Sequence, residues 1–127
     1  MLKKLVVLTA VLTVLLTPMA ARADHLDVIY IELQEGCSLP EYLAIIGDFN
    51  KWGTDYGYQA ELAVPLQSDE LGTMVWIGRS KNAEAFGRAW DAWRDAQMDS
   101  SSVPAQLQAR FDQCQEPLTV RKGYDTY

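Results

Sequence analysis

Histidine is nearly absent from this chain of 127 residues, in which His25 is the only one. A catalytic triad uses a histidine to carry the proton between nucleophile and leaving group, and a structural zinc site takes four ligands, mostly cysteine and histidine. One histidine and two cysteines supply neither arrangement. No glycine-rich loop with the spacing of a phosphate-binding motif is present either. We therefore expect no metal and no cofactor, and the sequence assigns no residue a catalytic role.

Only one apolar run, over residues 5–16, has the length of a secretory signal. It follows two lysines and precedes the tripeptide Ala-Arg-Ala at 21–23, a small-x-small cleavage site. The run is too short to span a bilayer, which takes about 20 residues. We therefore predict that residues 1–23 are a signal peptide and that residues 24–127 form a single domain, periplasmic or secreted, with no membrane contact after cleavage. A retained N-terminal anchor is the alternative, and in the cleaved chain His25 would lie at a frayed end.

Basic residues are outnumbered, with 11 Lys and Arg against 17 Asp and Glu. Loss of residues 1–23 removes three bases and no acid, which takes the net charge from −6 to −9. A domain this acidic is repelled by phosphate backbones and by anionic lipid surfaces. We therefore expect no nucleic-acid partner.

The two cysteines, Cys37 and Cys114, are far apart in the sequence and form no CxxC motif. In an exported protein such a pair indicates a structural disulfide. Closing so long a loop stabilises the fold by roughly 4–5 kcal/mol on the chain-entropy estimate. Two free thiols are the alternative.

The rest of the chain alternates between strand and helix patterns. Period-two alternation predicts strands over 27–34, 58–67, 73–79 and 118–127. Helical spacing of apolar residues predicts helices over 39–56, from the N-cap Asn82 onward, and over 103–113. Ser38 and Glu41 have the spacing of a capping box before the first helix. Pro65 places the second strand at an edge or a bulge, because proline has no N–H to donate, and Gly123 is a candidate bulge in the last strand.

This order, strand–helix–strand–strand–helix–strand with an extra short helix before the last strand, is the α+β ferredoxin-like βαββαβ sandwich, with helices on one face of an antiparallel sheet. In that topology the last strand pairs with the first. Cys37, just after the first strand, then lies near Cys114, just before the last. The topology and the disulfide are thus two separate inferences that agree.

Three of the four tryptophans lie within residues 76–96. In the second helix, Phe86, Ala89, Trp90 and Trp93 form one apolar stripe, which is typical of a helix packed on a sheet. The other face of the sheet would carry Val28, Tyr30 and, in one arrangement, Trp76. An uncovered apolar face of this kind favours a homodimer packed sheet against sheet.

The exported βαββαβ unit, the Gly36 turn and the segment WIGRSKNAEAF over 76–86 resemble the dimeric α+β barrel superfamily, in particular its antibiotic-biosynthesis-monooxygenase-like branch. The resemblance implies a homodimer with a cleft between sheet and helices in each subunit. The superfamily includes cofactor-free oxygenases and haem-degrading enzymes. Many active members carry a histidine in the second helix, whereas residues 87–93 contain none. Haem degradation is therefore not expected.

A cleft of this kind would be lined by aromatic or polar residues on inward-facing stripes. Our candidates for binding a small apolar or aromatic ligand are Tyr30, Trp76 and Trp90 as walls, Asn50 as a hydrogen-bonding group and Arg79 at the mouth. Each of them also has a purely structural interpretation. Three hypotheses remain: a non-catalytic homodimeric ligand-binding or structural protein, a cofactor-independent monooxygenase-like enzyme with an aromatic pocket, and an accessory subunit whose acidic surface docks a basic partner.

Overall fold

The computed structural model describes residues 24–118 and 120–127, so the expected signal peptide at 1–23 lies outside the described residues. The elements are, in order, β1 (His25–Ile31), α1 (Leu39–Thr54), β2 (Gln59–Ala63), β3 (Met74–Ser80), α2 (Ala83–Ala96), α3 (Val103–Cys114) and β4 (Arg121–Asp125). No helix within this described part is long and apolar enough to cross a membrane.

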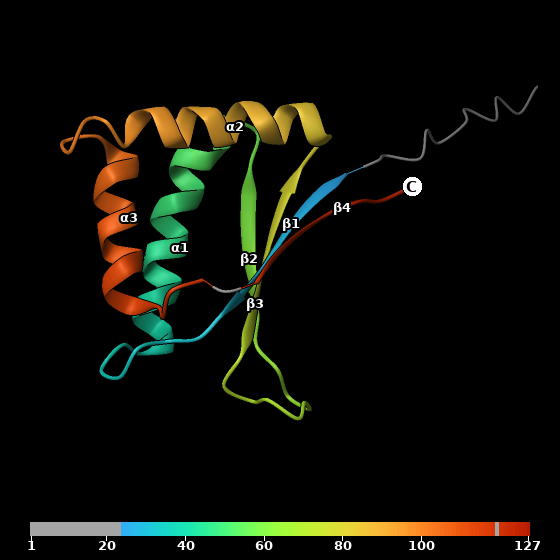
Figure 1. Cartoon of the computed structure of the whole chain (residues 1–127), viewed down its shortest axis with the longest axis vertical. Coiled ribbons are helices and arrows are strands. Elements are labelled where there is room, and N and C mark those ends of the chain that lie inside the picture. Colours follow the sequence, from blue (N-terminus) through green and yellow to red (C-terminus); the bar gives the residue numbers. More distant parts are fainter. Residues whose placement is uncertain (1–23, 119) are drawn as a thin grey trace, which may run out of the picture.

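The four strands form one sheet in the order β2-β3-β1-β4, with every neighbouring pair antiparallel. Figure 1 shows α1 and α3 side by side on one side of this sheet, with α2 lying across their ends. The prediction of a ferredoxin-like α+β fold with an additional helix before the last strand is therefore confirmed.

The start of α1 follows from its cap. The Ser38 side chain accepts a hydrogen bond from the backbone N–H of Glu41, and the Glu41 carboxylate accepts one from the N–H of Ser38 at 2.7 Å. The helix ends at Thr54, two residues before the predicted end, because the backbone turns there. The N–H of Tyr58 donates back to the carbonyl of Gly53, and Gly57 adopts a φ of 67°, which glycine tolerates best. This turn leads the chain directly into β2.

Three strand predictions need correction. β1 begins at His25, which pairs with Ser80 on one side and Asp125 on the other, so this end of the described chain is not frayed. β2 lies at an edge of the sheet, as Pro65 predicted, but it ends at Ala63 and not at residue 67. Gly123 forms no bulge, because β4 pairs with β1 in unbroken register.

The predicted disulfide is present between Cys37 and Cys114, which are 77 residues apart in sequence. It lies beside the isolated bridge between Leu33 and Gln115, which extends the contact between the end of β1 and the segment after α3. The topology therefore brings the two cysteines together as expected.

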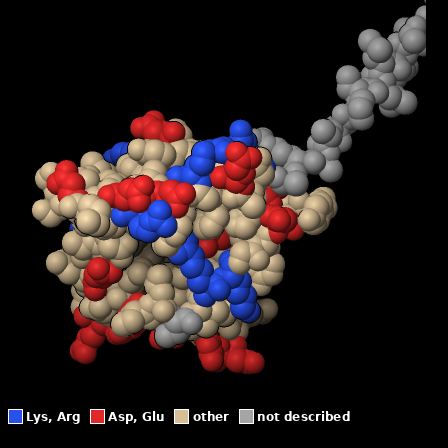
Figure 2. Space-filling view, turned by 45° about the horizontal axis from the view of Figure 1, so that its top comes forward, with Lys and Arg blue, Asp and Glu red and all other residues tan. Residues whose placement is uncertain are grey.

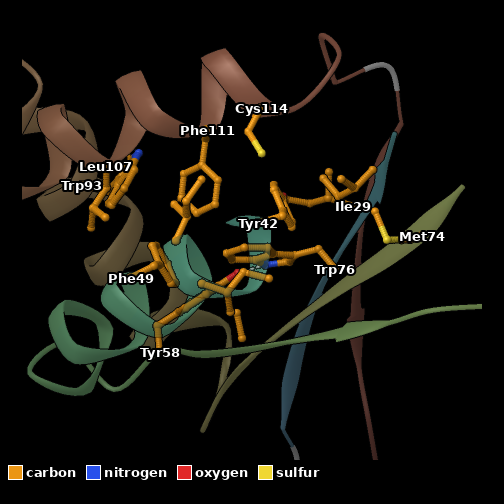
Figure 3. Packing of buried hydrophobic residues seen from close by; sticks show 14 of the residues in the cluster. Ile29, Tyr42, Phe49, Tyr58, Met74, Trp76, Trp93, Leu107, Phe111 and Cys114 are labelled. Atoms are coloured by element: carbon orange, nitrogen blue, oxygen red, sulfur yellow. Dashed lines mark hydrogen bonds between the residues drawn. The ribbon is translucent and has the colours of Figure 1, made fainter. Parts of the chain in front are cut away.

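The helix face of the sheet forms the core, which Figure 3 shows from close by. Trp76 belongs to this face: it pairs with Ile29 across the ladder and is 5 % exposed, so its suggested place on the uncovered face is wrong. Phe49 of α1 lies at the centre, with the Trp76 and Trp93 rings at 5.1 and 5.2 Å between centroids. Edge-to-face packing of this kind holds the helices against the sheet.

Candidate functional site

A cavity of about 120 Å³ lies between the helix face of the sheet and the three helices. Most of its wall is aromatic, and the aromatic lining residues are Tyr42, Phe49, Trp52, Tyr58, Trp76, Phe86, Trp90, Trp93 and Phe111. Five of these rings, those of Tyr42, Phe49, Tyr58, Trp76 and Phe111, are seen converging in Figure 3. An apolar pocket with a few polar groups is the usual form of a small-molecule site.

The polar part of the wall is a network centred on Asp27, which is 2 % exposed. Arg121 of β4 donates to both carboxylate oxygens, from Nε at 2.8 Å and from Nη2 at 2.6 Å. The hydroxyl of Tyr58 donates to Oδ2 of Asp27 at 2.9 Å and accepts from the indole Nε1 of Trp76 at 2.8 Å. A buried carboxylate is tolerated in the core because these partners surround it.

Burial, reinforced by the negative charge of Asp27, raises the pKa of Tyr58 above its ordinary value. The phenol is therefore neutral at physiological pH. Burial acts to lower the pKa of Arg121, but the hydrogen bonds and charge of Asp27 outweigh it, so the pKa is raised. The network thus holds a charged guanidinium on Arg121 and a neutral hydroxyl on Tyr58.

The Arg121 guanidinium also covers two rings of α2. Its central carbon lies 4.3 Å from the centroid of Trp90 and 5.9 Å from that of Phe86. Trp90 is 41 % exposed although it lines the cavity, so it stands at the opening rather than in the core. Stacking of a guanidinium on an indole face is favourable. Arg121 and Trp90 therefore form the rim of the cavity.

Two glutamines line the cavity near α3. The amide oxygen of Gln115 accepts from the hydroxyl of Tyr42 at 2.7 Å, and that of Gln108 accepts from the indole of Trp93 at 3.3 Å. Gln115 is only 8 % exposed. Burial raises the pKa of Tyr42, which keeps this hydroxyl protonated and able to donate.

Of the five residues proposed from sequence, the structure brings Trp76 and Trp90 together at the cavity. Asn50 faces β2, where its amide donates to and accepts from the backbone of Ala60, both at 2.8 Å. Its hydrogen-bonding groups are therefore used to attach α1 to β2.

Tyr30 and Arg79 lie away from the cavity. Both belong to the opposite set of alternating strand positions. The ammonium of Lys122 lies 5.5 Å from the Tyr30 ring centroid, and Arg79 forms an exposed ion pair with Glu61 at 3.1 Å.

Sequence reasoning missed Asp27, Tyr58, Gln115 and Arg121. Asp27 could have been found, because it shares the inward alternation of Ile29 and Ile31, where an acid needs a partner. Arg121 could not, since no pattern in the short β4 distinguishes its inward residue from its outward ones.

His25 lies outside the polar network. Its Nδ1 is 2.8 Å from Oδ1 of Asp125, and its ring centroid is 4.7 Å from that of Phe86. Within the described residues no three His, Cys, Asp or Glu side chains are grouped so that they could hold a metal ion.

No protein-family model matches the sequence, and no curated protein matches it significantly. Solved structures do match. A hydroxynitrile lyase from Passiflora edulis superposes with a TM-score of 0.53 and 13 % identity, covering 84 % of this chain and 95 % of that one. A protein from Shewanella oneidensis gives 0.50 and 15 %, covering 83 % and 92 %.

A third match is a dimeric protein of unknown function and ferredoxin-like fold from Bacteroides fragilis. It has a TM-score of 0.46 and 8 % identity, and the match covers 81 % of this chain and 96 % of that one. Identities this low show the fold alone. The matches to the hydroxynitrile lyase and the Shewanella protein show that the chain shares their fold, and its strand order is the ferredoxin-like one that the sequence predicted.

Proposed function

We propose that this protein is a homodimeric α+β barrel that binds a small apolar or aromatic ligand in the cavity without transforming it. The observation that carries the proposal is the aromatic cavity with its internally paired polar groups. The open volume is close to the roughly 150 Å³ of an engineered apolar cavity that binds benzene. Such a space therefore suits a ligand with a single ring.

The pairing of the polar groups supports binding rather than catalysis. A general base must be free to take a proton from the substrate. Asp27 already accepts from Arg121 and Tyr58, and the Tyr58 hydroxyl is both donor and acceptor within the same network. These groups stabilise the cavity wall and are not available to exchange protons with a ligand.

The outer face of the sheet supports a second copy of this chain as partner. Val28 pairs with Ile77 and Tyr30 with Val75 across the β1–β3 ladder, so these side chains form one continuous apolar patch. Tyr30 is 39 % exposed and the other three are half-buried in the single chain. Sheet-to-sheet packing under two-fold symmetry would cover the patch on both copies.

We further infer that the protein works in the periplasm or outside the cell. The disulfide between Cys37 and Cys114 supports this, because disulfides persist in oxidising compartments. Mass spectrometry of the protein secreted by a bacterial host is expected to give a chain starting at Asp24 and lacking two hydrogens. A chain that retains its first 23 residues would contradict cleavage.

Ligand binding is tested by calorimetric titration of the full chain, purified from the periplasm, with ethylbenzene. We expect saturable binding that is abolished in Ala89→Leu, because Ala89 is 3 % exposed and its added volume would enter the cavity. Ala44→Leu, at an exposed position of α1, is the matched control and should bind normally. Equal binding by both variants would contradict the proposed site, and consumption of a ligand would indicate an enzyme instead.

A further inference from the structure

We propose that the cavity selects a neutral single-ring aromatic compound carrying a hydrogen-bond acceptor such as a ketone oxygen, and that the amide of Gln115 recognises this acceptor. The inference rests on the proposed ligand-binding function and adds the class of ligand to it. It follows from counting which polar atoms in the cavity wall are already used.

The acceptors in the wall are occupied. Both oxygens of Asp27 accept from Arg121, and the second also accepts from Tyr58. The amide oxygens of Gln108 and Gln115 accept from Trp93 and from Tyr42, respectively. A ligand that offers only hydrogen-bond donors would therefore share oxygens that already accept a bond, and it would satisfy no unmet acceptor among these side chains.

One donor that belongs to a buried residue of the wall makes no hydrogen bond within the described residues, although water can enter the cavity beside it. The amide nitrogen of Gln108 donates to Asp112 at 2.8 Å, whereas that of Gln115 has no hydrogen-bond partner among the described residues. Gln115 is 8 % exposed, and its amide oxygen is held by Tyr42, so the side chain cannot turn away without losing that bond. An unmet donor in a low-dielectric site favours a ligand that supplies the missing acceptor.

Arg121 supplies a second unused donor, at the rim. Its Nη1 makes no hydrogen bond among the described residues, but the side chain is 36 % exposed and solvent reaches it. Water can satisfy this nitrogen before a ligand arrives. The selective donor inside the cavity is therefore the Gln115 amide.

Charge in the cavity favours a neutral ligand over an anion. The positive charge of Arg121 is balanced by Asp27, whose side chain is 3 % exposed. A ligand carboxylate would lose its water and meet no unpaired cation in the wall. A ketone or amide oxygen needs only one donor and has a far smaller desolvation cost.

The test uses three ligands of similar size on the full chain purified from the periplasm: acetophenone, ethylbenzene and benzoate, each titrated by calorimetry. We expect acetophenone to bind about tenfold more tightly than ethylbenzene, as one net hydrogen bond allows, and more tightly than benzoate. The variant Tyr42→Phe/Gln115→Leu removes the donor together with its partner, so that no buried polar atom is left unpaired. It should lose the tenfold preference while still binding ethylbenzene.

Gln113→Leu, at an exposed position near the end of α3, is the matched control and should keep the preference. Equal binding of ethylbenzene and acetophenone to the unaltered chain would overturn this inference and leave the proposed function standing. Tightest binding of benzoate would overturn the preference for a neutral ligand. A preference for acetophenone over ethylbenzene that persists in the double variant would show that Gln115 does not recognise the ligand's acceptor. Binding of none of the three would contradict the proposed function itself.

Discussion

At the scale of single residues, Asp27 has the largest influence on the cavity. It is buried on β1 and is the common partner of Arg121 and Tyr58, which reach it from β4 and from the residue just before β2. An ion pair with one buried partner adds little net stability compared with an apolar core, but removing either group leaves the hydrogen-bonding groups of the other without their partner. The network therefore stabilises the arrangement in which β1, β4 and the segment before β2 meet at Asp27.

Asp27→Asn is expected to lower the free energy of unfolding by about 1–3 kcal/mol, because the hydrogen bonds from Arg121 and Tyr58 lose their charged acceptor, while solvent at the 36 % exposed Arg121 side chain screens its unpaired charge. Urea denaturation followed by tryptophan fluorescence measures this change. Asp91→Asn is the control, since Asp91 pairs with Arg94 on the surface and is 60 % exposed, and it should change stability little. Equal effects of the two substitutions would mean that the Asp27 network does not stabilise the fold.

Gly78 also determines where Tyr58 lies, because the phenol of Tyr58 occupies the space that a β-carbon at residue 78 would fill. Gly78→Ala should displace Tyr58 from Asp27 and destabilise the protein by about 1–3 kcal/mol through overpacking. Thermal unfolding of this variant is compared with that of Gly87→Ala, where a β-carbon meets nothing within 4 Å. In the α2 interior the second substitution should stabilise by about 0.5–1 kcal/mol. A stable Gly78→Ala protein would show that Tyr58 can be repositioned without cost.

At the scale of elements, the cap of α1 determines where the first helix begins. Hydrogen bonds from the backbone and the hydroxyl of Ser38 lower the pKa of Glu41 below its ordinary value. A lowered pKa in the folded state means that the stabilisation is complete above the pKa of glutamate in the unfolded chain. It is lost as the pH falls through the lower folded value.

Ser38→Ala should lower the free energy of unfolding by about 1 kcal/mol at neutral pH, because the N–H of Glu41 loses its acceptor. The difference between this variant and the unaltered protein should shrink in acid, as Glu41 becomes protonated in both. Urea midpoints measured from neutral pH down to pH 3 follow this change. A difference that stays constant over that range would show that the charge of Glu41 does not take part in the cap.

At the scale of the whole molecule, charge and apolar surface are distributed differently. On the face shown in Figure 2, acidic side chains lie mostly around the edges, while basic ones gather across the middle and right of the view. The apolar patch, in contrast, is confined to the outer side of the sheet, at Val28, Tyr30, Val75 and Ile77. The proposed association through this patch would therefore be driven by burial of apolar area rather than by opposite charges.

Val28→Glu should convert the proposed dimer to monomers, because two carboxylates would be buried against each other near the two-fold axis. Light scattering after size exclusion reports the molecular mass. Val103→Glu introduces the same charge at a position of α3 that is 53 % exposed, and it should leave the dimer intact. A monomeric parent protein would contradict the dimer and leave the cavity, which lies within one chain, unaffected.

Much of the fold follows from local patterns in the sequence. The alternation Ile29–Ile31, the capping residues Ser38 and Asn82, and the stripe Phe86–Trp93 predict each element within a few residues, because backbone geometry and side-chain periodicity act over short distances. The disulfide was inferred from the two cysteines and the export signal, and the order of elements separately placed Cys37 near Cys114. The element ends were less accurate, since turns such as the one at Gly57 depend on long-range hydrogen bonds.

The cavity, by contrast, was decided by the tertiary structure. The sequence alone determined the ferredoxin-like order, the pairing of Cys37 with Cys114 and the aromatic character of the core. Only the folded chain brings Asp27 and Arg121, 94 residues apart, within hydrogen-bonding distance. Only the strand register places Trp76 on the helix face and Tyr30 on the other, since a shift of one residue would exchange the two faces. A polar network between distant segments has no local period, and so no sequence pattern reports it.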